Sequence, residues 1–78
     1  MTINEAVAAI EKLVEQRTVV SSQVRPSGDD VDVIKVWVDL GTTKIDPDEW
    51  AKSFEEQVRK EVPEAAGYRL QIRAETLP

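Results

Sequence analysis

The chain has neither cysteine nor histidine among its 78 residues. It can therefore form no disulfide, and it lacks the thiolate and imidazole ligands that most often hold zinc in proteins. A domain this short buries a modest share of its surface, and small domains often add cross-links or metals to compensate. We expect the stability of this chain to come from an apolar core, or from association with a partner or a second copy.

The same absences narrow the chemistry that the chain can perform. Histidine is the commonest general base and cysteine the most reactive thiol nucleophile. The serines Ser21, Ser22 and Ser53 lie outside any G-x-S-x-G pattern, and the three glycines are too widely spaced for a phosphate-binding loop. A two-layer domain of this size also has little room for a catalytic cleft. We therefore expect no enzyme activity, no catalytic residue, no cofactor and no metal.

Sequence signals for export or membrane insertion are also missing. The opening residues, MTINEAVAAIEK, have no basic start ahead of an apolar run, as a signal peptide would. No apolar stretch approaches the roughly 18 residues that span a bilayer. A chain without cysteine also fits a reducing compartment. These features predict a cytoplasmic protein that does not engage a membrane.

Negative charge is in excess: the chain has 15 acidic and 10 basic residues, and its formal net charge is −5. This balance argues against indiscriminate binding to nucleic acid or anionic lipid, which requires a cationic surface. Net charge and surface pattern are separate quantities, however. A local basic patch is compatible with this composition.

What is present indicates one domain over residues 1–78 with five elements in the order α-β-β-α-β. The first is a helix over residues 3–16, where Thr2 and Glu5 stand at the spacing of a capping box. Its apolar residues recur at spacings of three and four, which is typical of one buried helical face. These residues are Ile3, Val7, Ile10, Leu13 and Val14.

Two strands follow this helix. Residues 18–25 are rich in β-branched side chains, and residues 26–30 contain the proline, glycine and aspartates that favour a turn. Residues 31–40 alternate between apolar and polar positions, which predicts a strand with one buried side. The buried side holds Ile34, Val36, Val38 and Leu40, and the other side holds Lys35, Trp37 and Asp39. We expect these two strands to form an antiparallel hairpin.

The second helix has a clear start, with Asp46 as the cap, Pro47 at the first helical position and Glu49 completing a capping box. Trp50, Phe54 and Val58 lie four residues apart, so we expect them in the core. Pro63 ends the helix, and residues 64–67 form a return loop. A last strand over residues 68–74, or a little beyond, turns Tyr68, Leu70, Ile72 and Ala74 one way and Arg69, Gln71 and Arg73 the other.

These elements predict an α+β fold with two layers, a three-stranded sheet with both helices packed on one face. A right-handed crossover through the second helix makes the second and third strands parallel. Whether these strands are adjacent or separated by the first strand is left open by the sequence.

This arrangement leaves the opposite sheet face uncovered. That face carries Lys35, Trp37 and Asp39 from the middle strand, and Arg69, Gln71 and Arg73 from the last strand. The first strand adds either Val19, Ser21, Gln23 and Arg25 or the alternate set, because its pattern is weak. We therefore expect a locally basic surface around a tryptophan, in spite of the negative net charge.

Trp37 is the strongest functional signal in the sequence, because tryptophan and arginine are enriched at binding hot spots. A structural alternative is that Trp37 packs across the sheet on the side chain of Arg69 or Arg73. With no catalytic chemistry, the face predicts a protein–protein interaction module that binds another protein or a second copy through Trp37, Lys35, Arg69 and Arg73, or through a sheet edge. The alternative is an RNA- or ribosome-associated domain that stacks bases on the same face.

Three segments resemble, in pattern, the N-terminal domain of the ribosome maturation factor RimP. These are the strand that ends in aspartate at 36–39, the acidic helix start at 46–49 and the strand opened by an aromatic at 68–72. The resemblance implies the same α-β-β-α-β order. The chain departs from the family after the last strand, where it reads Arg73-Ala74-Glu75-Thr76 in place of Ser-Ser-Pro-Gly.

Overall fold

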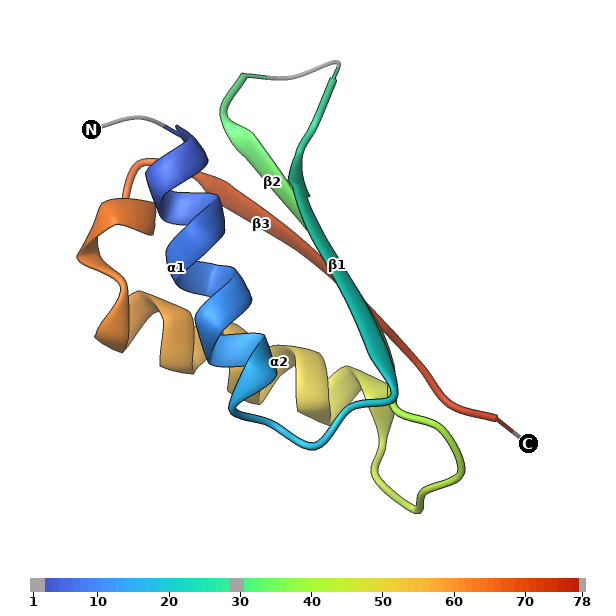
Figure 1. Ribbon diagram of the computed structural model, residues 1–78. Helices are drawn as coiled ribbons and strands as arrows, with labels where there is room; N and C mark the ends of the chain where they lie inside the picture. The colour runs from blue at the N-terminus through green and yellow to red at the C-terminus, as the bar shows by residue number, and fades with distance from the viewer. Residues whose placement is uncertain (1–2, 29–30, 78) are drawn as a thin grey trace.

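A computed structural model describes residues 3–28 and 31–77 of the chain (Figure 1). The predicted cap Thr2 and the turn residues Asp29 and Asp30 lie outside the described residues. The elements are α1 (Ile3–Glu15), β1 (Ser21–Pro26), β2 (Val33–Asp39), α2 (Pro47–Glu61), the 3-10 helix η1 (Pro63–Ala65) and β3 (Arg69–Glu75). Their order confirms the predicted α-β-β-α-β sequence, with η1 as an addition.

The sheet has the strand order β1-β2-β3, so β2 is central and lies beside both other strands. β1 pairs with β2 in antiparallel orientation, as expected for the hairpin, and β2 pairs with β3 in parallel. The structure thereby settles the strand order that the sequence left open. It also fixes the cross-strand neighbours of Trp37, which are Gln23 on β1 and Arg73 on β3.

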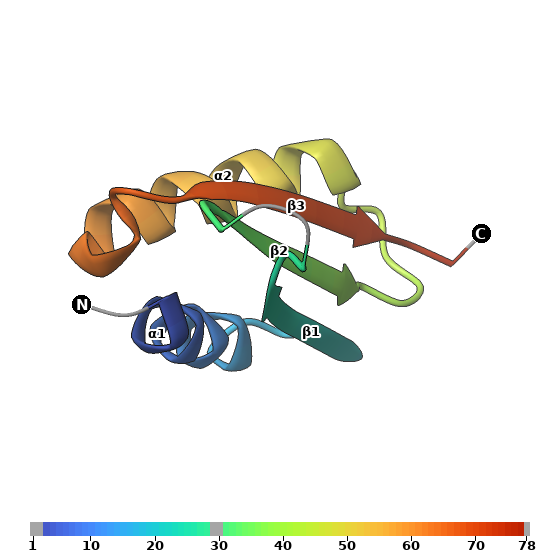
Figure 2. The same ribbon diagram turned by 90° about the horizontal axis from the view of Figure 1, so that it is seen from above.

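Both helices pack on the same face of this sheet, which confirms the predicted two-layer α+β architecture. α1 packs mainly against β1, and α2 packs mainly against β3. Figures 1 and 2 show the two helices in one layer and the three strands in the other. The core fills the space between these layers, and the other face of the sheet is turned away from the helices.

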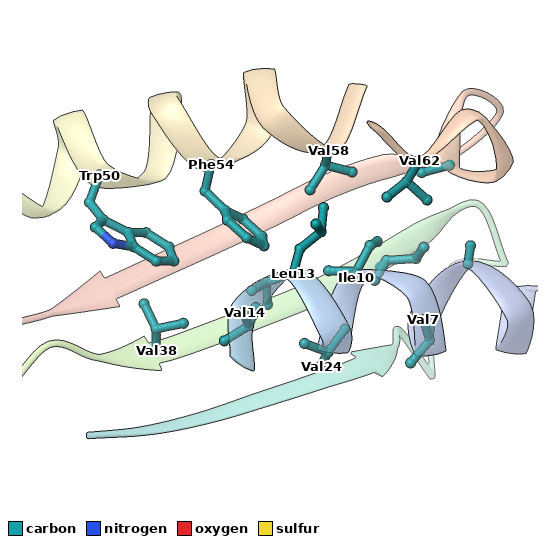
Figure 3. Packing of buried hydrophobic residues seen from close by; sticks show 14 of the residues in the cluster. Val7, Ile10, Leu13, Val14, Val24, Val38, Trp50, Phe54, Val58 and Val62 are labelled. Atoms are coloured by element: carbon teal, nitrogen blue, oxygen red, sulfur yellow. The ribbon is translucent and has the colours of Figure 1, made fainter. Parts of the chain in front are cut away.

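The core contains the apolar stripes that the sequence predicts. The largest side chains buried without measurable exposure, or nearly so, are Phe54, Ile10, Ile34, Val14, Val36, Val38 and Val58. Side chains from α2 point toward the sheet and meet those of α1 (Figure 3). Trp50 is buried as well and stacks on Phe54, with 5.0 Å between ring centroids and 13° between ring planes. The expectation that both aromatic residues are core residues is confirmed.

Arg17 closes the end of this core where α1 leads into the sheet. Its guanidinium carbon lies 5.1 Å from the ring centroid of Trp50 and 5.2 Å from that of Phe54. The Nε atom of Arg17 donates a hydrogen bond to Oε1 of Gln57 at 2.9 Å. One charged side chain thus ties the α1–β1 connection to two successive turns of α2. No sequence pattern predicts this role for Arg17.

The hairpin strands are shorter than predicted. β1 begins at Ser21 rather than Thr18, because the preceding residues carry the chain from the helical layer to the sheet. In that connection Val19 packs against the core, whereas Val20 is 69% exposed. β1 extends to Pro26, one residue beyond the predicted end, which is tolerated because this is an edge strand.

The other boundaries differ for local reasons. β2 begins at Val33, after a turn that includes residues 31 and 32, and it ends at Asp39 rather than Leu40. Gly41 then adopts a positive φ of 71° that turns the chain away from the strand direction. The cap of α2 is confirmed, because Oδ1 of Asp46 accepts a hydrogen bond from the backbone N–H of Asp48 at 2.9 Å. The predicted return loop is partly wrong, since Pro63–Ala65 forms a 3-10 turn.

Candidate functional site

The alternation of β2 separates the two faces of the sheet as the sequence predicts. Ile34, Val36 and Val38 are almost fully buried under the helices. Lys35 and Trp37 lie on the opposite face and are half-buried. We call this surface the open face, meaning the sheet face turned away from α1 and α2.

The contribution of β1 to the open face was left undecided by the sequence. Val24 is 8% exposed and belongs to the core, so its neighbours Gln23 and Arg25 point to the open face. Val19, which was grouped with them, packs against the core instead. The one available sequence signal was Val24, the only aliphatic residue in the segment SSQVRP. A single apolar residue is a weak guide to strand orientation, which explains the ambiguity.

Pairing across the sheet arranges the open face in rows. One row is Gln23–Trp37–Arg73, and the next is Arg25–Lys35–Gln71. Neighbouring strands lie about 4.8 Å apart, so each row spans about 10 Å. The side chains of these rows line a shallow groove of about 610 Å³, which we call the Trp37 groove.

The groove brings together three of the four predicted binding residues. Trp37, Lys35 and Arg73 all line it, and Arg25 adds a further cation. Arg69 lies on the same face but pairs with Val33, one row further toward the hairpin turn, and does not line the groove. Three of the predicted residues therefore line one groove, together with Arg25, which the sequence offered as one of two alternatives for the first strand.

The charge of the open face changes sign along the strands. Arg25, Lys35 and Arg69 lie toward the hairpin turn. Asp39 and Glu75 are cross-strand neighbours at the opposite end of the sheet. The predicted basic surface is therefore basic at one end and acidic at the other. The alternation of the last strand placed Arg73 on this face. The predicted strand end was left open beyond Ala74, and the structure extends β3 to Glu75.

Two polar contacts occur at the acidic end of the open face. Nε of Arg73 lies 2.9 Å from Oε1 of Glu75, in an ion pair between exposed side chains of one strand. Such exposed pairs contribute little to stability. Oδ1 of Asp39 accepts a hydrogen bond from the backbone N–H of Gly41 at 2.9 Å. Part of the positive charge beside Trp37 is thus compensated within the chain.

The surroundings of Trp37 bear on the alternative that it serves as cross-strand packing. Arg73 is its direct neighbour on β3, as that alternative requires, but the guanidinium of Arg73 is engaged by Glu75. Within the described residues, the recorded cation–π contacts are those of Arg17. Trp37 is half-buried and its side chain is one of those that line the groove.

Other kinds of site find no counterpart in the part of the chain that the structure describes. Residues 3–28 and 31–77 contain no group of three acidic side chains placed to hold a metal ion. Neither of the described α-helices has the length and hydrophobicity needed to cross a bilayer. Comparisons of the chain with models of protein families, with curated proteins and with solved structures find no match. The candidate site thus depends on the geometry of the open face.

Proposed function

We propose that this chain is a small non-enzymatic protein-binding module, an adaptor, inhibitor or accessory subunit of the cytoplasm, that recognises a partner protein through the open face. The observation that carries the proposal is the Trp37 groove, where a half-buried tryptophan lies among long polar side chains. Interface hot spots have this composition, with an aromatic anchor inside a polar rim.

The charges along the open face indicate which charges a partner surface would carry. Lys35 and Arg25, at one end of the groove, favour acidic groups on a partner, and Glu75, at the other end, favours a basic group. A partner segment must therefore carry charges of both signs in the correct direction along the strands. This polarity favours specific docking over adhesion to any anionic surface.

The same charge pattern favours a protein partner over RNA. Sheet platforms that bind single-stranded RNA stack successive bases on two or three aromatic side chains, whereas this face offers one. The ion pair of Arg73 and the carboxylate of Asp39 lower the positive potential that phosphates require. A protein partner satisfies the mixed charges better than a phosphate backbone does.

The test is a pull-down experiment. It compares the proteins that bind to the native chain with those that bind to Trp37→Ala and to the control Ile45→Ala. Ile45 is also a large exposed apolar residue, 52% exposed, in the connection between β2 and α2. A captured protein is purified and its affinity measured directly. We expect Trp37→Ala to weaken binding by roughly 30-fold or more, the effect of a hot-spot residue. Ile45→Ala should leave the affinity unchanged.

Two results contradict the proposal. Equal binding by native chain and Trp37→Ala, with both folded by circular dichroism, shows that the open face is not the docking surface. Capture that disappears after ribonuclease treatment, together with direct binding to single-stranded RNA that weakens steeply with salt, assigns the face to RNA.

A further inference from the structure

The outer edge of β3 is a second surface without a strand partner. In the described part of the chain β3 pairs with β2 on one side only, and Figure 2 shows β3 and β1 at opposite edges of the sheet. β3 has seven residues and contains neither proline nor glycine. Edges of this kind accept further strands unless a protein blocks them.

The hydrogen bonds of β3 define which backbone groups face outward. The N–H of Arg69 donates to the carbonyl of Asp32 at 2.7 Å, and the carbonyl of Glu75 accepts from Leu40 at 2.8 Å, so the odd-numbered residues of β3 face β2. In a strand, alternate residues present their backbone groups to opposite sides. The N–H and C=O groups of Leu70, Ile72 and Ala74 therefore point to the open edge.

The outer edge of β3 is unavailable at its first residues, and the outer edge of β1, on the opposite side of the sheet, is a poorer site for pairing. The carbonyl of Tyr68 already accepts a hydrogen bond from Nη2 of Arg59 at 2.8 Å, so the free section begins at Leu70. On β1, the N–H of Ser27 donates to Val33, which leaves Pro26 among the outward-facing residues. Proline has no N–H, so the β1 edge lacks a donor that the β3 edge keeps.

We propose that β3 pairs in antiparallel orientation with β3 of a second copy of this chain, joining two sheets into one of six strands. The two-fold axis passes beside Ile72, so that Ile72 faces Ile72 of the partner subunit and Leu70 faces Ala74 of the partner subunit. Each of the three outward-facing residues then exchanges both of its backbone hydrogen bonds with the other chain. All six free groups of each edge find a partner.

Charge complementarity selects this register. On the open face it places Arg69 directly opposite Glu75 of the partner subunit, twice by symmetry, and Gln71 opposite Arg73 of the partner subunit. A shift of two residues one way sets Arg69 against Arg73 of the partner subunit, and a shift the other way sets Arg73 against its own copy. Like charges directly opposite each other destabilise a strand pair, and opposite charges stabilise it.

The helix-facing side of the edge supports the same pairing. Leu70, Ile72 and Ala74 are apolar and half-buried, and they pack against the margin of the core. Opposite residues of an antiparallel pair lie on the same sheet face, so the paired edges place these side chains against one another. The dimer thus covers apolar surface that a single chain leaves partly exposed.

The absence of cysteine makes the register directly measurable. Gln71→Cys and Arg73→Cys are single exposed substitutions on the open face, and the proposed register brings position 71 of one chain opposite position 73 of the other. Directly opposed, non-hydrogen-bonded residues have Cα atoms about 4.5 Å apart, which is within disulfide range. With diamide as the oxidant, a mixture of the two variants should cross-link to a 71–73 heterodimer faster than either variant alone.

Light scattering measures the association itself without any partner protein. For the native chain, the average mass should rise with concentration toward twice the mass of one chain. Arg69→Glu sets a carboxylate against the carboxylate of Glu75 of the partner subunit and should weaken dimerisation by roughly tenfold. Lys12→Glu, the same charge change at an exposed site of α1, should leave the dimer intact.

The outcomes are decisive in each direction. A native chain that remains monomeric at millimolar concentration overturns the proposal, as does unchanged dimerisation of Arg69→Glu. Faster cross-linking of Gln71→Cys alone or Arg73→Cys alone shows that the copies pair in a shifted register. Because these measurements omit the partner protein, they do not depend on the proposed function of the Trp37 groove.

Discussion

Gly41→Ala tests how tightly the end of β2 is constrained. Gly41 is buried, has a φ of 71° and accepts a hydrogen bond from the N–H of Leu77 at 3.0 Å. Left-handed backbone costs a residue with a Cβ about 1–2 kcal/mol. A Cβ at this position would also lie 2.7 Å from Cγ2 of Val20, too close for an unstrained contact.

The expected loss of stability combines these two effects. Alanine reduces the freedom of the unfolded chain, which offsets about 0.4–1 kcal/mol of the backbone cost. The side chain of Val20 is 69% exposed and can rotate away, at a cost of about 0.5–1.5 kcal/mol. We expect Gly41→Ala to lower the free energy of unfolding by about 1–2 kcal/mol, a large fraction of the margin of so small a domain.

Urea denaturation followed by tryptophan fluorescence measures this loss, and a double-mutant cycle separates its causes. Val20→Ala alone should change stability by less than about 0.5 kcal/mol, since it is an exposed site. In the double variant the contact with Val20 is removed, so the loss should be smaller than for Gly41→Ala alone. A Gly41→Ala variant as stable as the native chain refutes the backbone argument. Strict additivity refutes the contact.

Two other sites allow similar tests by urea denaturation. Asp46→Ala removes the acceptor for the N–H of Asp48 and should destabilise the chain by about 1 kcal/mol, whereas Asp46→Asn keeps the cap and should cost less; equal losses contradict a capping role. Arg17→Met removes the guanidinium from Trp50 and its hydrogen bond to Gln57 and should cost about 1–2 kcal/mol, with a changed tryptophan emission. A neutral Arg17→Met shows that the stacked geometry contributes nothing.

The parts of the fold that sequence could predict are those with a strong local code. The α2 helix has a capping aspartate, a proline at its first position and an apolar residue every fourth position, and all three features hold. The alternation of β2 was equally reliable, because its buried positions lie at the centre of the sheet. β1 was located less well, since its boundaries depend on the distance between α1 and the sheet rather than on its own residues.

The candidate site was predictable to the extent that it follows from β2 and β3. Trp37, Lys35 and Arg73 could be assigned to one face from alternation, but their distances depend on strand order, which the sequence left open. Arg25 could be assigned to the groove only from the structure, because the buried position of Val24 shows which way β1 faces. The acidic end was underestimated because the prediction left the end of β3 open beyond Ala74 and did not assign Glu75 to the open face.

The proposed dimer and the Trp37 groove constrain each other through the same register. The row Gln23–Trp37–Arg73 continues across the interface into Gln71 of the partner subunit and Lys35 of the partner subunit, so the two grooves join on one continuous face. With strands about 4.8 Å apart and an offset of two residues along them, Trp37 lies about 16 Å from Trp37 of the partner subunit. A single extended partner segment can therefore contact both indoles, and the two-fold axis reverses the charge order that it meets in the second groove.

A segment whose charges match the order of charges in one groove meets the reverse order in the other groove, and so fits the second groove poorly. Binding should therefore saturate at one segment per dimer when the segment is long enough to cover both grooves, and at two when it is short. Calorimetric titration with segments of both lengths measures this ratio. A ratio of one segment per chain at every length would show that the grooves act independently.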